Sequence, residues 1–209
     1  MKKIVSLLGI SGSGKSTQIE MLKEHYGEDV LIASVPGMIK NKNNFHSFLT
    51  EGEKVLIKSL QKEIDCTREL GMLSPIDLDI LLFDVCLNRA DQNIVIFDGC
   101  PRGNAQTILL WNKMTKSQKE NYYVFILAFP DHQEEYSFYR QYFRGIEEHG
   151  VVDTYSKIQR FINKISVYNK DTLLGINFLE NKTKKCITIN SLSDKKKINN
   201  DIISKIDDN

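Results

Sequence analysis

The sequence predicts an α/β protein with a three-layer α/β/α fold, built around a mostly parallel five-stranded sheet with a small helical lid. Two observations lead to this prediction. Short apolar runs alternate along the chain with segments whose apolar residues recur at helical spacing, which is typical of βαβ units and a parallel sheet. A glycine-rich segment also separates the first apolar run from a helical pattern. The five predicted strands are residues 4–8, 30–35, 93–97, 123–129 and 185–190.

The first loop of the chain carries its most specific motif. Residues 9–16 spell G-x-x-x-x-G-K-[ST] between a predicted buried strand and the helical pattern over 17–23. Glycines let backbone N–H groups converge on one point, and the following helix adds the positive end of its dipole there. This setting favours the phosphate loop of the P-loop NTPases over an ordinary glycine-rich turn, with a nucleotide polyphosphate as ligand. The residues expected to hold that nucleotide are Gly9, Ser11, Gly12, Ser13, Gly14, Lys15, Ser16 and Thr17.

Two residues of this loop have expected chemical roles of their own. Lys15 would reach the β and γ phosphates of ATP, and the Ser16 hydroxyl would hold Mg²⁺.

Composition indicates one compact domain over residues 1–209. Of these residues 41% are hydrophobic and 26% are charged, which is ordinary globular usage. The net charge is +1, from 28 basic and 27 acidic residues, so no overall field recruits nucleic acid or an anionic membrane. The sequence shows no signal peptide or membrane-length apolar run, and we expect a cytoplasmic protein. The four cysteines at 66, 86, 100 and 186 are expected to be small buried apolar groups rather than metal ligands.

The middle of the chain places charged side chains after predicted strands. The second strand is expected to end at Pro36-Gly37 and to lead into an exposed polar loop over 40–44. Apolar spacing predicts a helix over 78–90, before the strand that ends at Asp98. Asp98 has the position of an acid that orders Mg²⁺, or alternatively caps a turn. Because ligands bind at the carboxyl ends of parallel strands, we expect Asp98 to converge with the glycine-rich loop.

Three arginines are further candidates. Arg102 follows Asp98 by four residues and offers a planar fork for a phosphate, although it could be an isolated surface residue. Arg140 and Arg144 lie four residues apart, hence on one helix face, where they could close over a phosphoryl group or simply be solvated. After 181 the chain is rich in Lys and Asn, but its apolar pattern predicts a last strand and a covering helix, with a disordered tail as the alternative.

The chain resembles the nucleoside monophosphate kinases, and it looks most like the thymidylate kinases. Residues 9–18 are similar to the thymidylate kinase loop, whose third residue is usually acidic where this chain has Ser11. Leu73-Ser74-Pro75, with Phe83 and Arg89 beyond, resembles the helix that presents a Phe and an Arg to the acceptor base in that family. The resemblance therefore implies that Phe83 and Arg89 bind the acceptor, although six positions separate them where the family has four.

A second resemblance, to adenylate kinase, covers residues 98–106. Asp98-Gly99-Cys100-Pro101-Arg102 is similar to its D-G-F-P-R segment. This resemblance implies that Arg102 contacts the acceptor phosphate, that Gln106 reads an adenine edge and that Lys40 stands where an Arg is expected. Both families imply an acceptor-binding region, here 36–75, and a lid, here 133–153, entered at Arg140 and Arg144. An arginine expected near Asp153 is missing.

The function expected is transfer of the γ-phosphoryl of ATP to a nucleoside monophosphate, most of all dTMP to give dTDP. Lys15, Arg102, Arg140 and Arg144 would be the catalytic residues, and Ser16 and Asp98 would hold Mg²⁺. Alternatives are an AMP- or CMP-type kinase, a binding-only relative, and a nucleoside kinase, which would need a carboxylate base. The candidates for such a base are Glu63, Asp65, Asp77 and Asp79. A GTPase ranks low because the chain lacks an Asn-Lys-x-Asp signature. Separately, the family resemblance implies a possible homodimer.

Overall fold

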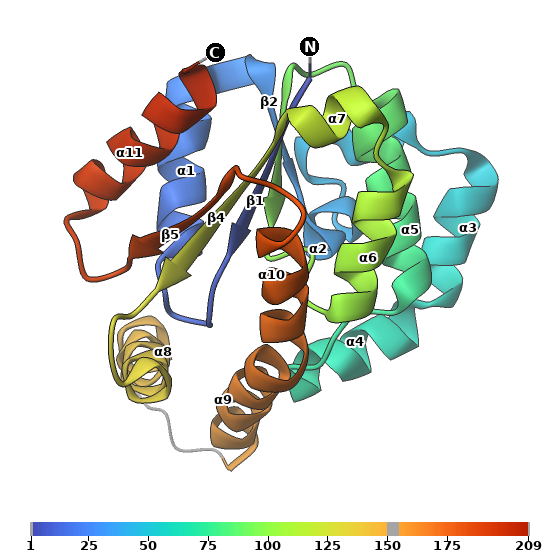
Figure 1. Cartoon of the computed structure of the whole chain (residues 1–209). Helices are drawn as coiled ribbons and strands as arrows, with labels where there is room; N and C mark the ends of the chain where they lie inside the picture. The colour runs from blue at the N-terminus through green and yellow to red at the C-terminus, as the bar shows by residue number, and fades with distance from the viewer. Residues whose placement is uncertain (1, 150–154, 209) are drawn as a thin grey trace.

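The protein contains one five-stranded sheet in which every strand pair is parallel, as seen in a computed structural model that describes residues 2–149 and 155–208 (Figure 1). The strand order is β2-β3-β1-β4-β5. The strands are β1 (Lys3–Leu8), β2 (Val30–Ala33), β3 (Ile94–Asp98), β4 (Tyr122–Ala128) and β5 (Cys186–Asn190). The α/β class and the five strands are therefore confirmed, and the sheet is parallel throughout.

The connections explain why helices cover both faces. The β1–β2 connection runs toward one edge of the sheet, whereas the three later connections run toward the other. Right-handed crossovers therefore place the first connecting helix on one face and the later ones on the opposite face. The first face carries α1 (Lys15–Tyr26) and α11 (Lys195–Asp207). Apart from two long helices described below, the helices of the later connections are α2 (Val35–Ile39), α3 (Glu51–Ser59), α4 (Gln61–Leu70), α5 (Ile76–Asp84), α6 (Asn104–Lys113), α7 (Lys116–Glu120) and α10 (Leu173–Glu180).

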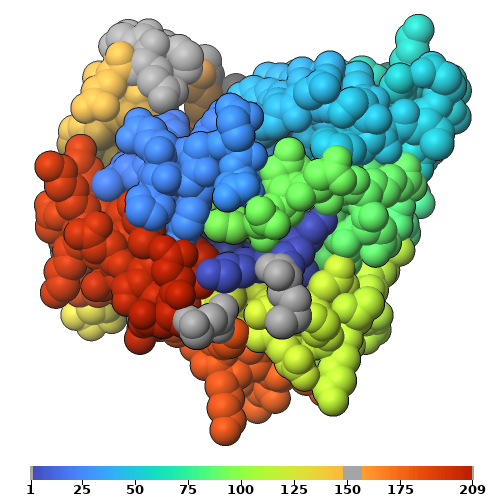
Figure 2. All heavy atoms as spheres, turned by 90° about the horizontal axis from the view of Figure 1, so that it is seen from above, coloured from blue at the N-terminus to red at the C-terminus, as the bar shows by residue number. Residues whose placement is uncertain are grey.

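Two hydrophobic cores lie on either side of the sheet. One packs α1 and α11 against the strands through residues such as Leu22, Ile198 and Ile202. The other joins α5, α6 and α10 to the opposite face through residues such as Phe83 and Leu110. In Figure 2, viewed from above, the red C-terminal helix and the green segments of the second layer flank the dark blue start of β1. The predicted covering helix is thus confirmed as α11, because Ile198, Ile202 and Ile206 are buried.

Two long helices, α8 (Gln133–His149) and α9 (Tyr155–Val167), lie beyond the carboxyl ends of β1 and β4 (Figure 1). The predicted lid over 133–153 corresponds to α8 up to residue 149, and residues 150–153 lie outside the described part. A π-helical segment (Tyr168–Thr172) joins α9 to α10, and another (Val85–Arg89) extends α5. Two 3₁₀ helices, Gly27–Asp29 and Lys42–Phe48, complete the described elements.

The structure corrects two smaller expectations. The second strand ends at Ala33 rather than 35, because Ser34 accepts a hydrogen bond from the Gly37 N–H and caps α2, with Pro36 in its first turn. Residues 40–44 are exposed as expected. Cys86 and Cys100 are buried and Cys186 is partly buried, but Cys66 is exposed on α4, contrary to the prediction.

Candidate functional site

The glycine-rich loop joins β1 to α1 with three residues in the left-handed half of backbone space. Gly9, Gly12 and Gly14 have φ values of 137°, 83° and 98°. A Cβ on Gly9 would lie 2.3 Å from the carbonyl oxygen of Leu127 in β4, so any side chain at this position would collide with the neighbouring strand. Helix α1 begins at Lys15, immediately after the loop. The predicted order of strand, loop and helix is therefore confirmed, with the positive end of α1 at the loop.

Lys15 folds back over this loop. Its Nζ donates hydrogen bonds to the carbonyl oxygens of Gly9 (2.7 Å) and Ile10 (2.8 Å). Burial, followed by the nearby charge of Arg102, lowers the pKa of Lys15 from 10.5 to about 7, although Asp98 opposes this shift. An anion placed beside Lys15 would offset both causes and favour the charged amine.

Helix α8 is fastened to the same loop from the other side. Ser11 Oγ donates to Gln141 Oε1 (2.8 Å), and Ser137 Oγ donates to the Ser11 carbonyl (2.7 Å). Arg140 donates to the Gly12 carbonyl (3.2 Å) and lies over the Phe129 ring. Ser11, which stands where the thymidylate kinase loop is usually acidic, thus links the loop to the predicted lid helix.

A cavity of about 570 Å³ opens above the loop at the carboxyl ends of the strands. It is lined by the loop, by Asp98 and by residues of α8 and α9. Cations predominate over carboxylates in its described lining: Lys15, Arg102, Arg140, Arg144 and Lys164 face Asp98 and Glu147. The structure therefore brings Arg140 and Arg144, which share a helix face as their spacing predicted, to one cavity with Lys15.

A second cavity, of about 640 Å³, adjoins the first on the side of α2 and α4. Residues that line both cavities mark where the two meet: Ser16, Gly71, Asp98, Gly99, Arg102 and Lys164. The second cavity also has a cationic lining among the described residues, with Lys40, Lys42, Arg68 and Arg160 in addition to Arg102 and Lys164. Lys40 lies in this cavity, within the region predicted to bind an acceptor.

Lys164 and Arg160 belong to the site, but the sequence analysis did not single them out. They lie four residues apart on α9 and both line the second cavity. Burial, followed by the charges of Arg160, Arg102 and Arg144, lowers the pKa of Lys164 from 10.5 to about 8. The spacing that identified Arg140 and Arg144 is also present here and could have found them. Helix α9 closely approaches the end of α4, where a Cβ on Gly71 would lie 2.8 Å from the Arg160 carbonyl oxygen.

Gln106 lies in the second cavity wall, but its amide is used within the protein. Its Oε1 accepts from the backbone N–H groups of Arg102 (2.7 Å) and Gly103 (3.2 Å), and its Nε2 donates to Asp79 Oδ2 (2.7 Å). Gln106 is 4% exposed. In this conformation both ends of the amide are occupied, so the expected reading of an adenine edge is not available to it.

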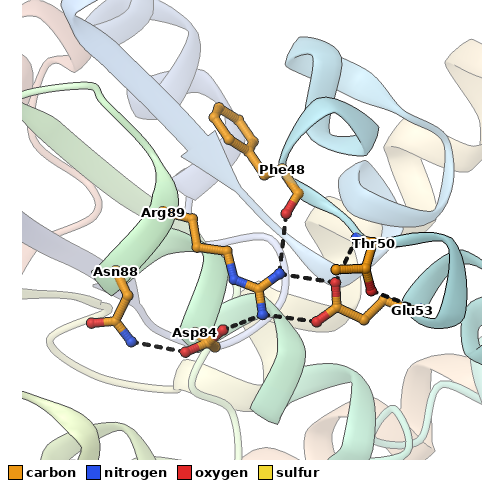
Figure 3. Close-up of polar contacts among 6 residues, drawn as sticks. All are labelled: Phe48, Thr50, Glu53, Asp84, Asn88 and Arg89. Carbon is orange, nitrogen blue, oxygen red and sulfur yellow. Dashed lines mark hydrogen bonds and ion pairs between the residues drawn. The ribbon is translucent and has the colours of Figure 1, made fainter.

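The structure does not bring Phe83 or Arg89 to either cavity. Phe83 is fully buried against the sheet, with its ring edge-on to Phe97 at a centroid distance of 5.5 Å. Arg89 points the other way, toward α3, where it binds Glu53, and it also binds Asp84 at the end of α5 (Figure 3). The π-helical segment adds one residue to the last turn, closed by a hydrogen bond from the Ala90 N–H to the Val85 carbonyl. The structure therefore does not support the predicted contacts of Phe83 and Arg89 with an acceptor base.

In the described part of the chain, the side chains at the junction of the cavities that offer oxygen to a metal are those of Ser16 and Asp98. Across residues 2–149 and 155–208, no three His, Cys, Asp or Glu side chains gather as a preformed metal site. Ser16 and Asp98 both line the junction of the cavities, and their hydroxyl and carboxylate suit Mg²⁺, which keeps waters and takes further oxygens from phosphates. The two residues therefore fit a phosphate-bound Mg²⁺ better than a site made of protein alone.

Comparisons with known proteins leave the site to be interpreted from its chemistry. No helix in the described part of the chain is both long and apolar enough to cross a membrane. No protein-family model matches the chain, and a search of curated proteins finds no significant match.

Proposed function

We propose that this protein is an ATP-dependent nucleoside monophosphate kinase with a P-loop NTPase fold. The observation that supports this best is the pair of adjoining cavities, both rich in cations, which meet at Ser16, Asp98, Arg102 and Lys164. One cavity contains the glycine-rich loop, which suits a polyphosphate donor. The other suits an acceptor whose phosphate points back toward the shared cations.

The proposed reaction needs alignment and charge neutralisation more than a strong base. The oxygens of an acceptor phosphate are already anionic, so one can attack the γ phosphorus of ATP in line while ADP leaves. Lys15 and Arg144 would bind the donor phosphates, and Arg102 and Lys164 would hold the acceptor phosphate close to them. Ser16 and Asp98 would hold Mg²⁺, which supplies charge neutralisation on the phosphates when bound. Helix α8, which lies against the glycine-rich loop, would help to exclude water from the phosphates.

The charge of the second cavity favours a phosphorylated acceptor over a neutral nucleoside. Its described lining holds more cations than carboxylates, and Asp65, one of the latter, is already paired with Arg68 (3.0 Å). Asp79 also lines this cavity and keeps a nucleoside kinase as the second candidate, because a buried carboxylate with a raised pKa could serve as a base. Glu63 and Asp77 line neither cavity.

Thymidylate is the first acceptor to test, because the family resemblance favours it. The two residues that would have selected thymine, Phe83 and Arg89, lie outside the cavities. The amide of Gln106, which would have read adenine, is also occupied, so the structure favours no one base among the monophosphates.

The test is ADP release by the purified protein with Mg·ATP and a panel of acceptors. The panel contains dTMP, dUMP, AMP, CMP, UMP and GMP, together with the unphosphorylated nucleosides. We expect turnover with at least one monophosphate and its loss by orders of magnitude in Lys15→Ala. Preference for a bare nucleoside would favour the nucleoside kinase. Absence of turnover above the Lys15→Ala control, with ATP still bound, would identify a binding-only relative.

A further inference from the structure

The backbone of Arg102 is held by hydrogen bonds on both sides. Its N–H donates to Gln106 Oε1 at 2.7 Å, and its carbonyl oxygen accepts from Thr172 Oγ1 at 2.5 Å. The next N–H, that of Gly103, also donates to Gln106 Oε1 at 3.2 Å. The side chain of Arg102 is exposed and lines both cavities. These hydrogen bonds therefore fix the backbone from which the Arg102 side chain extends to the junction of the cavities.

The direction of the Gln106 amide is essential to this arrangement. Only its oxygen can accept from the two backbone N–H groups, so its nitrogen must point the other way. There it meets Asp79 Oδ2 at 2.7 Å. An ionised carboxylate only accepts hydrogen bonds, so it stabilises this orientation of the amide and opposes the flipped one. Asp79 thus acts on Arg102 through Gln106.

Asp79 is itself tightly enclosed. It is 1% exposed and also accepts hydrogen bonds from the Cys100 thiol (3.5 Å) and the Ser74 hydroxyl (3.4 Å). Cys100 belongs to the same turn as Arg102, so the carboxylate contacts this turn both directly and through Gln106. A buried carboxylate is costly to keep, which argues that its hydrogen bonds serve a purpose.

We propose that Asp79 is a positioning residue that fixes the orientation of the Gln106 amide, and thereby holds the Arg102 guanidinium at the junction of the two cavities for anion binding. This inference rests on the proposed function only in identifying that anion as the acceptor phosphate. Gln106 then supports the turn, in place of the base-reading role that the resemblance to adenylate kinase implied.

A reciprocal swap tests the orientation directly. In Gln106→Glu two carboxylates face each other, which disfavours the native arrangement. In the double variant Asp79→Asn with Gln106→Glu, the new amide can donate to the new carboxylate, whose other oxygen still accepts from the N–H groups of Arg102 and Gly103. This double variant has the net charge of the wild type. Asp79→Leu removes the acceptor altogether and keeps the same branched arrangement of four side-chain heavy atoms.

Two measurements follow the variants without requiring turnover. Amide hydrogen exchange by NMR reports on the N–H groups of Arg102 and Gly103, and calorimetry gives the Kd for inorganic tripolyphosphate. In Asp79→Leu we expect exchange to become at least about tenfold faster and the Kd to rise about tenfold. In Gln106→Glu we expect at least one of these two changes. The double variant should return both quantities to within about threefold of the wild type.

A matched control separates the proposal from general destabilisation. Ser74→Ala removes only the long contact to the same Oδ2 atom, and exchange at Arg102 should change by less than about threefold. The proposal would be overturned by unchanged exchange in Asp79→Leu, or by an unchanged tripolyphosphate affinity in that variant despite faster exchange. A double variant that behaves no better than Gln106→Glu would also overturn it.

Turnover then separates this inference from the kinase assignment. If the wild type phosphorylates a monophosphate, its KM for that acceptor should rise about tenfold in Asp79→Leu and recover in the double variant. An acceptor KM that stays unchanged in Asp79→Leu would contradict positioning at the acceptor. If the wild type transfers nothing, the kinase assignment fails, and exchange and tripolyphosphate affinity still decide the role of Asp79.

Discussion

Arg89 binds Glu53 with both terminal guanidinium nitrogens, at 2.9 Å and 2.8 Å, and so links the end of the α5 helix to the start of α3 (Figure 3). The same guanidinium also donates to Asp84 and to the Phe48 carbonyl. The hydrogen bonds that Arg89 donates to Glu53 are the main reason that the pKa of Glu53 is lowered to about 2. The resemblance to thymidylate kinase implied a contact with an acceptor base, whereas the geometry indicates a structural clamp.

Replacing Arg89 by Met should therefore lower stability and leave acceptor binding unchanged. We expect a loss of about 1–2 kcal/mol in the free energy of unfolding, because the ion pair is bidentate but partly exposed. Lys54→Met is the matched control, since it removes the exposed pair with Glu51 on the same helix and should cost less than about 0.5 kcal/mol. Urea unfolding measures both. A large rise in the acceptor KM of Arg89→Met, with stability unchanged, would restore the base-binding role.

Alanine should be tolerated differently at two glycines of the loop. At Gly9 a Cβ would collide with the Leu127 carbonyl oxygen, whereas at Gly14 no heavy atom lies within 4 Å of the new Cβ. Both positions carry the backbone strain of a positive φ, about 1 kcal/mol, and only Gly9→Ala adds the overlap, about 1–3 kcal/mol more. Thermal unfolding of the two variants checks the order. If the two variants lost equal stability, the ends of β1 and β4 would be able to move apart and relieve the overlap at Gly9.

The sequence predicted those features that depend on local pattern and chain order. All five strands were found because each is a short apolar run next to turn residues. The convergence of Asp98 with the glycine-rich loop followed from parallel topology alone, since the carboxyl ends of the strands share one edge. Lys164 was missed although its spacing from Arg160 carried the same signal as that of Arg140 and Arg144.

The misplaced residues depend on partners far away in the chain. Phe83 fits an apolar run equally well as a core residue or as a pocket wall, and packing against Phe97 decides between them. The fate of Gln106 depends on Asp79, which lies 27 positions earlier. A motif gives the type of a side chain, but it does not show which distant carboxylate will form a hydrogen bond with that side chain.

Anion binding at the glycine-rich loop should weaken as the pH rises. Because burial and Arg102 hold the pKa of Lys15 near 7, the free protein loses this charge between pH 6 and pH 8. Sulfate, which does not titrate in this range, should bind about tenfold more weakly at pH 8 than at pH 6, as measured by NMR titration. Lys15→Arg keeps its charge and should retain only the shallower dependence due to Lys164. Equal pH profiles for the two proteins would show that Lys15 is fully charged throughout.

Stability should depend on pH through Asp79 in the opposite sense to an ordinary ion-paired carboxylate. Burial raises the pKa of Asp79 from 3.8 to about 6, against the hydrogen bonds from Cys100 and Gln106, so the folded state binds its proton more tightly than the unfolded chain does. This group therefore contributes stability at low pH that is lost as the pH rises through about 6. Relative to Asp79→Asn, which does not titrate, the wild type should gain about 2 kcal/mol between pH 7 and pH 4 in urea unfolding. A difference that stays constant, or that shrinks on acidification, would mean that the hydrogen bonds to the carboxylate outweigh its burial.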